Sequence, residues 1–520
     1  MDDKQHITKA AGLMSIATFI SRILGYMKDM ILAKFFGATG VADTFFVAFR
    51  IPNLLRELFA EGSMSSALIP VLTEYQTKQG MRETERLVRI TFTFILIFVG
   101  LTCSLGIIFA PTIVTVIAPG FLNIPEKFSL TVLLTRVMFP FLLFISLAAL
   151  AMGALNTRRV FFVPSLAPAM LNITIIAMVI ILVPRMEQPI IAVALWVALG
   201  GFIQFAFQIP FLFKNGYSML PEYNFGHPGL KKMSILILPA TMGMAVSQIN
   251  IFVSTILASF LPEGSITYLY YSMRLIQFPI GVFGVAMGMA VLPTLSEHAV
   301  KGEFGKLSDD FSFALRLLFF ITVPAMIGLI SLREPIVNIL FQRGKFDYTA
   351  TVGTAHALLF YSMGIWCIVG SRVITASFYS MQDTKTPVKV AMIALVANIT
   401  LSIILMNPLK HGGLALANSI ASGLNFTLLF LFLRKKLERI DTKRVLRSFA
   451  KTIFASSVMG LIGGMLLRSE IWHVHSNTLN KVFYLSGTIA ICIGLYLILS
   501  YLLKSEEASY VVRMVKEKFK

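Results

Sequence analysis

The sequence predicts an all-α polytopic membrane protein with about fourteen transmembrane helices. They are expected to form two parallel six-helix lobes around a central cationic cavity, with two extra C-terminal helices. The first observation is composition: of 520 residues, 56% are hydrophobic and 14% charged, and the mean hydropathy is +0.79. A soluble core could not hide so much apolar surface. No segment alternates like a β-strand, and lipid-exposed backbone must satisfy its own hydrogen bonds, so the spans are predicted to be helical.

The second observation is the spacing of the apolar runs. Charged, Pro and Gly clusters separate segments close to the roughly 20 residues that a bilayer core requires. The predicted spans are 8–28, 41–74, 86–110, 128–156, 160–184, 189–214, 231–260, 265–296, 307–332, 349–380, 386–408, 412–434, 448–468 and 482–503.

The distribution of basic residues predicts the orientation of these spans. The net charge is +19, which in a soluble protein would suggest nucleic acid. Here Lys and Arg concentrate in the connections on one side, above all in 434–451, and the positive-inside rule makes that side cytoplasmic. Both termini are therefore expected in the cytoplasm, and no nucleic-acid partner is expected.

The third observation is an internal repeat. The segment ALIPVLTEY at 67–75 returns as AVLPTLSEH at 290–298, a separation of 223 residues. The same separation relates Pro164 to Pro387, and a one-residue slip relates Arg50 to Arg274. Six spans per copy predict two lobes related by an axis along the membrane normal. The predicted divisions are 1–220, 221–438 and 439–520, the last holding two added spans and a cytoplasmic tail.

Basic residues inside predicted spans are the main functional signal. Charge at bilayer depth costs about 2.5–3.5 kcal/mol per Arg or Lys, so such residues need a wet, protein-lined space. A ring of arginines in a cavity selects a multiply anionic ligand, because the guanidinium grips phosphate or carboxylate with two donors and stays charged. The residues proposed to face the cavity are Arg22, Lys28, Arg50 and Arg56 from the first lobe and Arg274 and Arg372 from the second. Arg136 and Arg316, near span ends, are expected to snorkel.

Acidic residues near these bases allow a second interpretation, in which the bases form ion pairs within the protein. Arg22 could pair with Asp29, and Arg56 with Glu61, merely fixing helix packing. Asp43 could cap the second span or act as a counter-ion. Asp29 and Glu61 are candidate gate residues, with Glu61 beside Gly62 in a stretch expected to be kinked.

The chain resembles the MurJ (MviN) lipid II flippases of the MOP exporter superfamily. The resemblance is carried by SRILGYMKD, FGATGVADTFFVAFRIPNLLRELFAEGSMSSALIPVLTEY, YYSMRLIQFPIGVFGVAMGMAVLPTLSEH and FYSMQDTKTPVK, and extends over essentially the whole chain. It implies transfer of undecaprenyl-pyrophosphate carrying the disaccharide-pentapeptide of peptidoglycan from the inner to the outer leaflet by alternating access. It also implies a groove for the lipid tail at the last two spans. The site positions that match the family are Ser21, Arg22, Asp29, Asp43, Arg56, Glu61 and Arg274.

Departures from the family concern charge. Lys28 stands where relatives often have Arg, Glu57 replaces a second base, and Met273 and Gln277 replace acids beside Arg274. Residues 231–262 and 384–437 contain no Asp or Glu, so the sodium site assigned to some relatives is not carried over.

The resemblance implies a transporter in the bacterial cytoplasmic (inner) membrane, with lipid II, membrane lipids and the cell-wall synthesis machinery as candidate partners. No enzyme activity, cofactor or metal is expected, because no nucleotide-binding motif appears and the histidines are scattered. Cys103, Cys367 and Cys492 are predicted to be core residues. A flippase for another lipid-linked oligosaccharide and a MATE-like small-molecule antiporter remain the alternatives.

Overall fold

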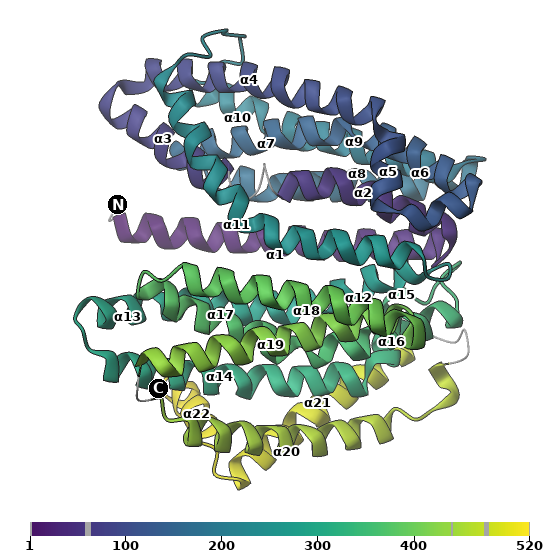
Figure 1. Ribbon diagram of the computed structural model, residues 1–520, viewed down its shortest axis with the longest axis vertical. Helices are drawn as coiled ribbons and strands as arrows, with labels where there is room; N and C mark the ends of the chain where they lie inside the picture. The colour runs from purple at the N-terminus through teal and green to yellow at the C-terminus, as the bar shows by residue number, and fades with distance from the viewer. Residues whose placement is uncertain (1–2, 58–63, 438–439, 473–477, 519–520) are drawn as a thin grey trace. The chain divides into compact units, whose positions relative to one another are not determined.

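The computed structural model describes residues 3–57, 64–437, 440–472 and 478–518 (Figure 1). Within these ranges the side chains of 3–11, 64–66, 238–247, 285–286, 470, 512, 514–516 and 518 are not described. Every regular element in the described part of the chain is a helix. The prediction of an all-α polytopic protein is confirmed.

The helices coincide with the predicted spans. Eleven helical segments are long and apolar enough to cross a membrane. The three other predicted spans coincide with α1, with α2 followed by α3, and with α11. In chain order the helices are α1 (Asp3–Phe36), α2 (Gly40–Arg56), α3 (Met64–Lys78), α4 (Gly80–Ile108), α5 (Ala110–Ile117), η2 (Pro119–Asn123), α6 (Pro125–Met138), α7 (Pro140–Thr157), α8 (Phe162–Leu182), η3 (Val183–Arg185), α9 (Pro189–Ala206), α10 (Ile209–Lys214), α11 (Pro228–Ser259), α12 (Ser265–Pro279), η4 (Ile280–Val285), α13 (Ala286–Val300), α14 (Phe304–Ser331), α15 (Arg333–Phe341), α16 (Tyr348–Met363), α17 (Ile365–Ser380), α18 (Lys385–Leu409), α19 (His411–Leu437), α20 (Thr442–Leu466), η5 (Glu470–Trp472), α21 (Thr478–Leu502) and α22 (Glu506–Lys518).

The chain divides into two compact units, Met1–Ile266 and Thr267–Lys520. In the first unit α8 packs on α1 and α9, α7 packs on α3, α4 and α9, and α2 packs on α6. The helix α11 also packs here, against α3, α5 and η2. The second copy of the sequence repeat begins with α11, but α11 packs against helices of the first copy. The boundary between the two units therefore falls after α11, one span later than the boundary between the two copies.

The second unit contains the rest of the second repeat and the two added spans. Its closest helix pairs are α18 with α19, α14 with α20, and α17 with α19, and α20 also packs on α21. An aromatic cluster forms part of its core, with the rings of Tyr271 and Phe341 4.6 Å apart and Phe346 beside both. Cys103, Cys367 and Cys492 are buried and free, as predicted.

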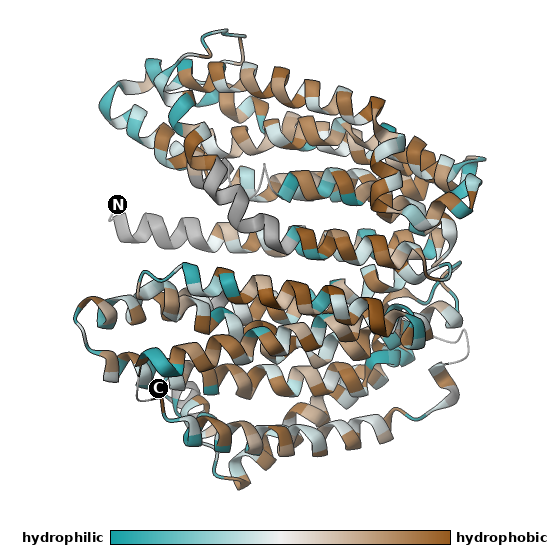
Figure 2. Ribbon diagram, viewed as in Figure 1, coloured by the Kyte–Doolittle hydropathy of each residue, from teal (hydrophilic) through white to brown (hydrophobic). Residues whose placement is uncertain are grey.

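The outward faces of many helices are apolar (Figure 2). Phe98 and Leu101 on α4 are 54% and 58% exposed, and Val396 on α18 is 64% exposed. Large apolar side chains in such numbers on a protein surface indicate contact with a non-aqueous environment. These faces are the ones that meet the hydrocarbon of the bilayer.

The second span of each repeat carries a π-type turn at the same position. A π-type turn occurs at Glu57, directly after α2, and the π-helical segment η4 begins at Ile280, which is 223 residues later. The helix that follows each break contains a proline at equivalent positions, Pro70 in α3 and Pro293 in α13. Proline removes a backbone donor, and π-type turns are common at functional sites, so both halves carry a weakened helix in the same place.

The C-terminal tail contains a helix that the apolar pattern did not predict. Arg316 of α14 donates to Glu506 and Glu507 of α22 at 2.7 and 2.9 Å. The prediction that Arg316 snorkels is wrong: its side chain is 7% exposed and Glu507 is 2% exposed. A guanidinium so deeply buried is stabilised by its carboxylate partners rather than by water, and this contact attaches α22 to the second unit.

A close backbone approach in the first unit provides a test of how α11 packs. A Cβ added at Gly120 of η2 would lie 2.3 Å from the backbone oxygen of Ser259 in α11. We expect Gly120→Ala to destabilise the protein by about 1–3 kcal/mol, as over-packing does elsewhere. The thermal midpoint in detergent, followed by size-exclusion chromatography, measures the effect.

The matched control is Gly100→Ala on α4, where a Cβ meets nothing within 4 Å. This substitution should be neutral or slightly stabilising. Equal thermal midpoints for the two variants would contradict the packing of α11 against η2.

Candidate functional site

Arg22 lies on an exposed face of α1. Asn172 of α8 donates to the backbone oxygen of Ser21 at 3.3 Å, which fixes the adjacent, half-buried face of α1 against the first unit. Arg22 itself is exposed, and neighbouring Phe19 and Ile23 are 61% and 45% exposed. Within the part of the chain that the structure describes, Arg22 has no hydrogen-bond or ion-pair partner. The predicted alternative, an Arg22–Asp29 ion pair, is therefore absent.

Asp29 has a different neighbour. The Lys28 ammonium lies 3.3 Å from the Asp29 carboxylate, and the two side chains are 9% and 1% exposed. Breaking a buried pair of this kind is costly because it leaves one charge uncompensated. Lys28 and Asp29 thus form a neutral pair two turns after Arg22, and Arg22 keeps its full charge.

Arg56 belongs to a polar network at the end of α2. Its Nε donates to Asn53 Oδ1 at 3.1 Å, and its Nη2 lies 3.9 Å from Glu57 Oε1. Asn53 Nδ2 donates to the same Glu57 oxygen at 2.9 Å, and Gln248 of α11 donates to the other at 2.7 Å. Arg50, one and a half turns earlier on α2, is half-buried. The network surrounds the C-terminal end of α2.

Asp43 joins three segments of the first unit. It lies in the first turn of α2 and is 1% exposed. Lys127 of α6 donates to its Oδ2 at 3.3 Å, and the backbone N–H of Gly264, after α11, donates at 2.8 Å. The helix cap is Thr39, whose hydroxyl accepts from the Ala42 N–H, so the alternative that Asp43 caps the second span is wrong. Asp43 is the counter-ion of Lys127.

The bases of the second unit lie near its broken span. Arg274, on α12, donates to Gln277 Oε1 at 3.3 Å, and its guanidinium lies 5.6 Å from the ring centroid of Tyr270. Arg372, on α17, is exposed and lies beside η4, since a Cβ at Gly284 would meet its Cδ at 3.5 Å. Gln277 and Tyr270 are neutral groups, and the contact with the Tyr270 ring is of the cation–π type.

Several polar residues of these clusters were not identified from the sequence. The spacing of Asn53 and Glu57 places them on one helix face, so that contact was detectable. Gln248 and Lys127 are distant in sequence from Glu57 and Asp43, and no local pattern indicates them. Glu61, a predicted gate residue, lies outside the described residues. In the described ranges no group of three His, Cys, Asp or Glu residues could hold a metal ion.

These features define a class of protein. An all-α membrane protein with an internal sequence repeat, a π-type turn at the same place in each copy and bases inside apolar spans has the construction of a secondary transporter. A solved multidrug resistance MATE family transporter of the MOP superfamily, in an inward-facing conformation, shares this fold. Its TM-score is 0.65 at 17% identity, covering 80% of this chain and 94% of that one.

Closer similarity identifies the family. The family model of lipid II flippase MurJ matches residues 32–483. A probable lipid II flippase MurJ of Vibrio cholerae is 35% identical over 513 residues, 96% of each chain, and the lipid II flippase MurJ of Burkholderia cenocepacia is 34% identical over 484 residues, 92% of this chain and 94% of its own. A solved lipid II flippase MurJ in an inward closed conformation has a TM-score of 0.78 at 29% identity, covering 94% of this chain and 98% of that one. The chain belongs to the MurJ family of lipid II flippases, and with its apolar spans it is a multi-pass inner-membrane protein.

The Asp43–Lys127 contact can be tested by a double-mutant cycle. Asp43→Asn or Lys127→Gln alone should each destabilise the protein by about 3–5 kcal/mol, because each leaves one buried charge without its partner. Asp43→Asn with Lys127→Gln should lose much less than the sum of the two. Thermal denaturation of the purified variants in detergent gives the coupling, and additive losses would exclude the ion pair.

Proposed function

We propose that this protein moves lipid II, the undecaprenyl-pyrophosphate carrier of the peptidoglycan disaccharide-pentapeptide, from the inner to the outer leaflet by alternating access. Family membership supports the substrate and makes the chain a transporter rather than an enzyme. The observation within the chain that supports the binding mode is Arg22, an exposed, unneutralised arginine in an apolar helix. An arginine at that depth is favourable only if water or an anion surrounds it.

The charge balance of the first unit favours a pyrophosphate. Lys28 is partly neutralised by Asp29, and Arg56 lies near Glu57, whereas Arg22 keeps its charge. A pyrophosphate carries several acceptor oxygens and can bind more than one guanidinium through paired hydrogen bonds. We propose that Ser21, Arg22, Lys28 and Arg56 form the part of the site that comes from the first unit.

Arg274 is proposed as the contribution of the second unit. Its contacts with Gln277 and Tyr270 position the guanidinium near η4. A ligand shifts a conformational equilibrium only by binding one state better, so alternating access requires the substrate to gain contacts in one state. Bases from both units would supply that difference. Arg50 and Arg372 add positive charge, and Asp29, Asp43 and Glu61 are the proposed counter-ions and gate residues.

The broken second spans support a moving element at the site. A π-type interruption follows Arg56 in the first repeat and lies six residues after Arg274 in the second. Discontinuous helices often flank transport sites, where freed backbone groups line a polar cavity and the two halves of a helix move separately. Arg56 and Arg274 thus each lie within six residues of a π-type turn.

We also propose that both chain ends lie in the cytoplasm. The basic connections, including the Arg434–Arg447 stretch, favour this orientation by the positive-inside rule. The enzymes of cell-wall synthesis that consume the flipped precursor are the candidate protein partners.

Arg22→Ala is expected to lower the affinity for the pyrophosphate head. Loss of hydrogen bonds to a charged group costs about 1.5–3 kcal/mol, which corresponds to a decrease of about tenfold or more. In cells depleted of their own flippase, the variant should fail to restore growth and lipid II should accumulate in the inner leaflet.

The control is Arg185→Ala, since Arg185 is exposed and contacts only the carbonyl of Ile181 four residues earlier. It should support growth like the unmodified protein. Full growth with Arg22→Ala, at the same membrane level, would remove Arg22 from the binding site.

A second pair of variants tests the role of Arg274. Arg274→Ala should abolish support of growth, whereas Arg274→Lys keeps the charge but loses the two-donor fork and should retain partial activity. Purified variants titrated with lipid II report binding directly. The proposal for Arg274 would be overturned by unchanged lipid II affinity in Arg274→Ala, whatever the growth phenotype.

A further inference from the structure

A basic cavity lies in the second unit where α22 is attached by Arg316, and none of the residues proposed to bind lipid II lines it. Its volume is about 400 Å³, and it is bounded by the start of α20, by α14 and by the start of α22. Its lining includes five bases and one serine, which are Arg316, Lys443, Arg444, Arg447, Lys451 and Ser448. Three carboxylates, those of Asp441, Glu506 and Glu507, also line it.

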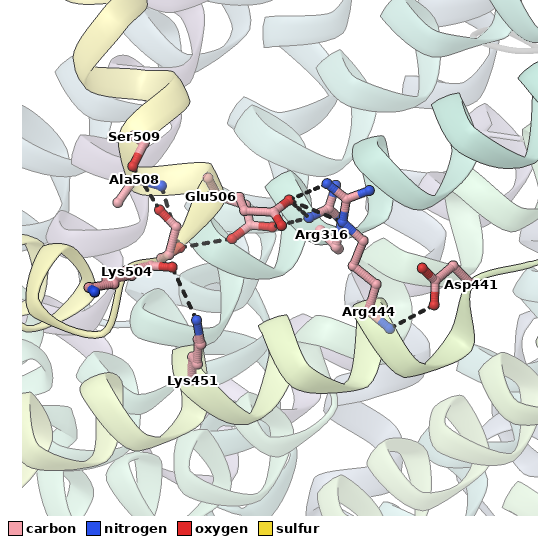
Figure 3. Close-up of polar contacts among 10 residues, drawn as sticks. Arg316, Asp441, Arg444, Lys451, Lys504, Glu506, Ala508 and Ser509 are labelled. Carbon is pink, nitrogen blue, oxygen red and sulfur yellow. Dashed lines mark hydrogen bonds and ion pairs between the residues drawn. The ribbon is translucent and has the colours of Figure 1, made fainter.

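The carboxylates do not neutralise all of the bases. Glu507 is committed to Arg316 at 2.9 Å, in a pair whose side chains are 2% and 7% exposed. Asp441 accepts from the backbone N–H of Arg444, as the cap of α20, and Lys451 donates to the backbone carbonyl of Lys504 (Figure 3). Lys443, Arg447 and Lys451 have no carboxylate partner in the described part of the chain. The cavity is therefore positive.

The contact between Glu506 and Arg444 is of a different kind from the buried pair. Figure 3 shows Arg316 and Arg444 converging on the carboxylate of Glu506. The Arg444 and Glu506 side chains are 54% and 57% exposed, with Arg444 Nη2 at 2.6 Å. Hydrogen bonds from Arg444 and then Arg316 lower the pKa of Glu506, so it is charged at neutral pH. Exposed pairs contribute little to stability, so an incoming anion can displace Glu506 from Arg444.

Two buried donors in the cavity wall are unsatisfied. Arg316 Nε and Ser448 Oγ are buried and have no hydrogen-bond partner among the described residues, and their residues are only 6% and 7% exposed. Buried donors without acceptors are unfavourable, and the observation points to a ligand that brings several acceptor oxygens. A phosphate group has that property.

The surface of α20 indicates a lipid as the source of the phosphate. Lys443, Arg447 and Lys451 follow one another at four-residue intervals, and the same helical stripe continues with Phe454 and Leu461, which are 58% and 65% exposed. A stripe that begins basic and becomes apolar matches a molecule with an anionic head and a hydrocarbon tail. Basic clusters at the end of a transmembrane helix are known to recognise anionic lipid heads.

We propose that this cavity binds the phosphate of an anionic glycerophospholipid of the surrounding leaflet, with Arg447 and Lys451 as its principal bases. The lipid head competes with Glu506 for Arg444, and the acyl chains lie along α20 past Phe454. The site is separate from the bases assigned to lipid II and does not depend on lipid II transport. With both chain ends in the cytoplasm, as proposed above for the spans, the cavity binds a lipid of the cytoplasmic leaflet.

Lipid titrations of the purified full-length protein test the proposal. Native mass spectrometry in detergent should show saturable binding of dioleoylphosphatidylglycerol and weaker binding of zwitterionic dioleoylphosphatidylcholine. Arg447→Gln with Lys451→Gln should lower the phosphatidylglycerol affinity about tenfold, as expected for removing two bases near an anionic head group. Glu506→Gln should raise the affinity about threefold, because it removes the competing carboxylate.

The higher phosphatidylglycerol affinity expected for Glu506→Gln cannot arise from a folding defect, because a folding defect does not increase affinity. The matched control is Lys385→Gln with Lys389→Gln, which removes two exposed bases at the same four-residue spacing at the start of α18. It should leave the affinity unchanged. An equal loss in the control, no loss in the Arg447/Lys451 variant, or no gain with Glu506→Gln would each overturn the proposal. Inorganic phosphate that competes fully with the lipid at equal concentration would instead assign the site to a free anion.

Discussion

The cost of placing charge at bilayer depth is the constraint on which the rest of this structure depends. Each arginine or lysine there loses about 2.5–3.5 kcal/mol unless it finds a carboxylate, water or an anionic ligand. The chain uses these solutions at different places. Lys127 and Arg316 are buried against carboxylates, whereas Arg22 lies exposed with no carboxylate partner in the described part of the chain. The same physical problem therefore separates structural bases from those available to a substrate.

In each copy of the repeat, charged residues lie near a π-type turn of the second span. Glu57 and Ile280 occupy equivalent positions, and both are in a π-type turn of the second span. In the first unit the Glu57 carboxylate accepts amide hydrogen bonds from Asn53 and Gln248. Such contacts are individually modest, on the order of 1 kcal/mol net, or somewhat more when one partner is charged. They can exchange during a transport cycle more readily than the packed apolar core around them.

The substrate explains why such a construction is useful. A lipid-linked sugar has a head that cannot enter hydrocarbon and a tail that need not leave it. In the proposed site, cationic side chains lower the energy of the pyrophosphate, while the exposed apolar faces of the helices keep the protein in contact with lipid. The lipid proposed for the basic cavity at α20 follows the same complementarity, with Arg447 and Lys451 as the bases for a head group that is not transported.

Composition and the spacing of the apolar runs determined the class of protein and the helical spans, because burial in lipid depends on the hydrophobic pattern over short stretches of sequence. They also located Arg22, Arg56 and Arg274, since charge in an apolar run is visible in one dimension. Matching segments along the sequence determined the repeat. Only the tertiary structure decided which charges are neutralised. The partners of Asp43, Glu57 and Arg316 are Lys127, Gln248 and Glu507, which lie 84 to 191 residues away. Ion pairs and hydrogen bonds act over a few ångströms of space, and helix packing rather than sequence distance brings such groups together.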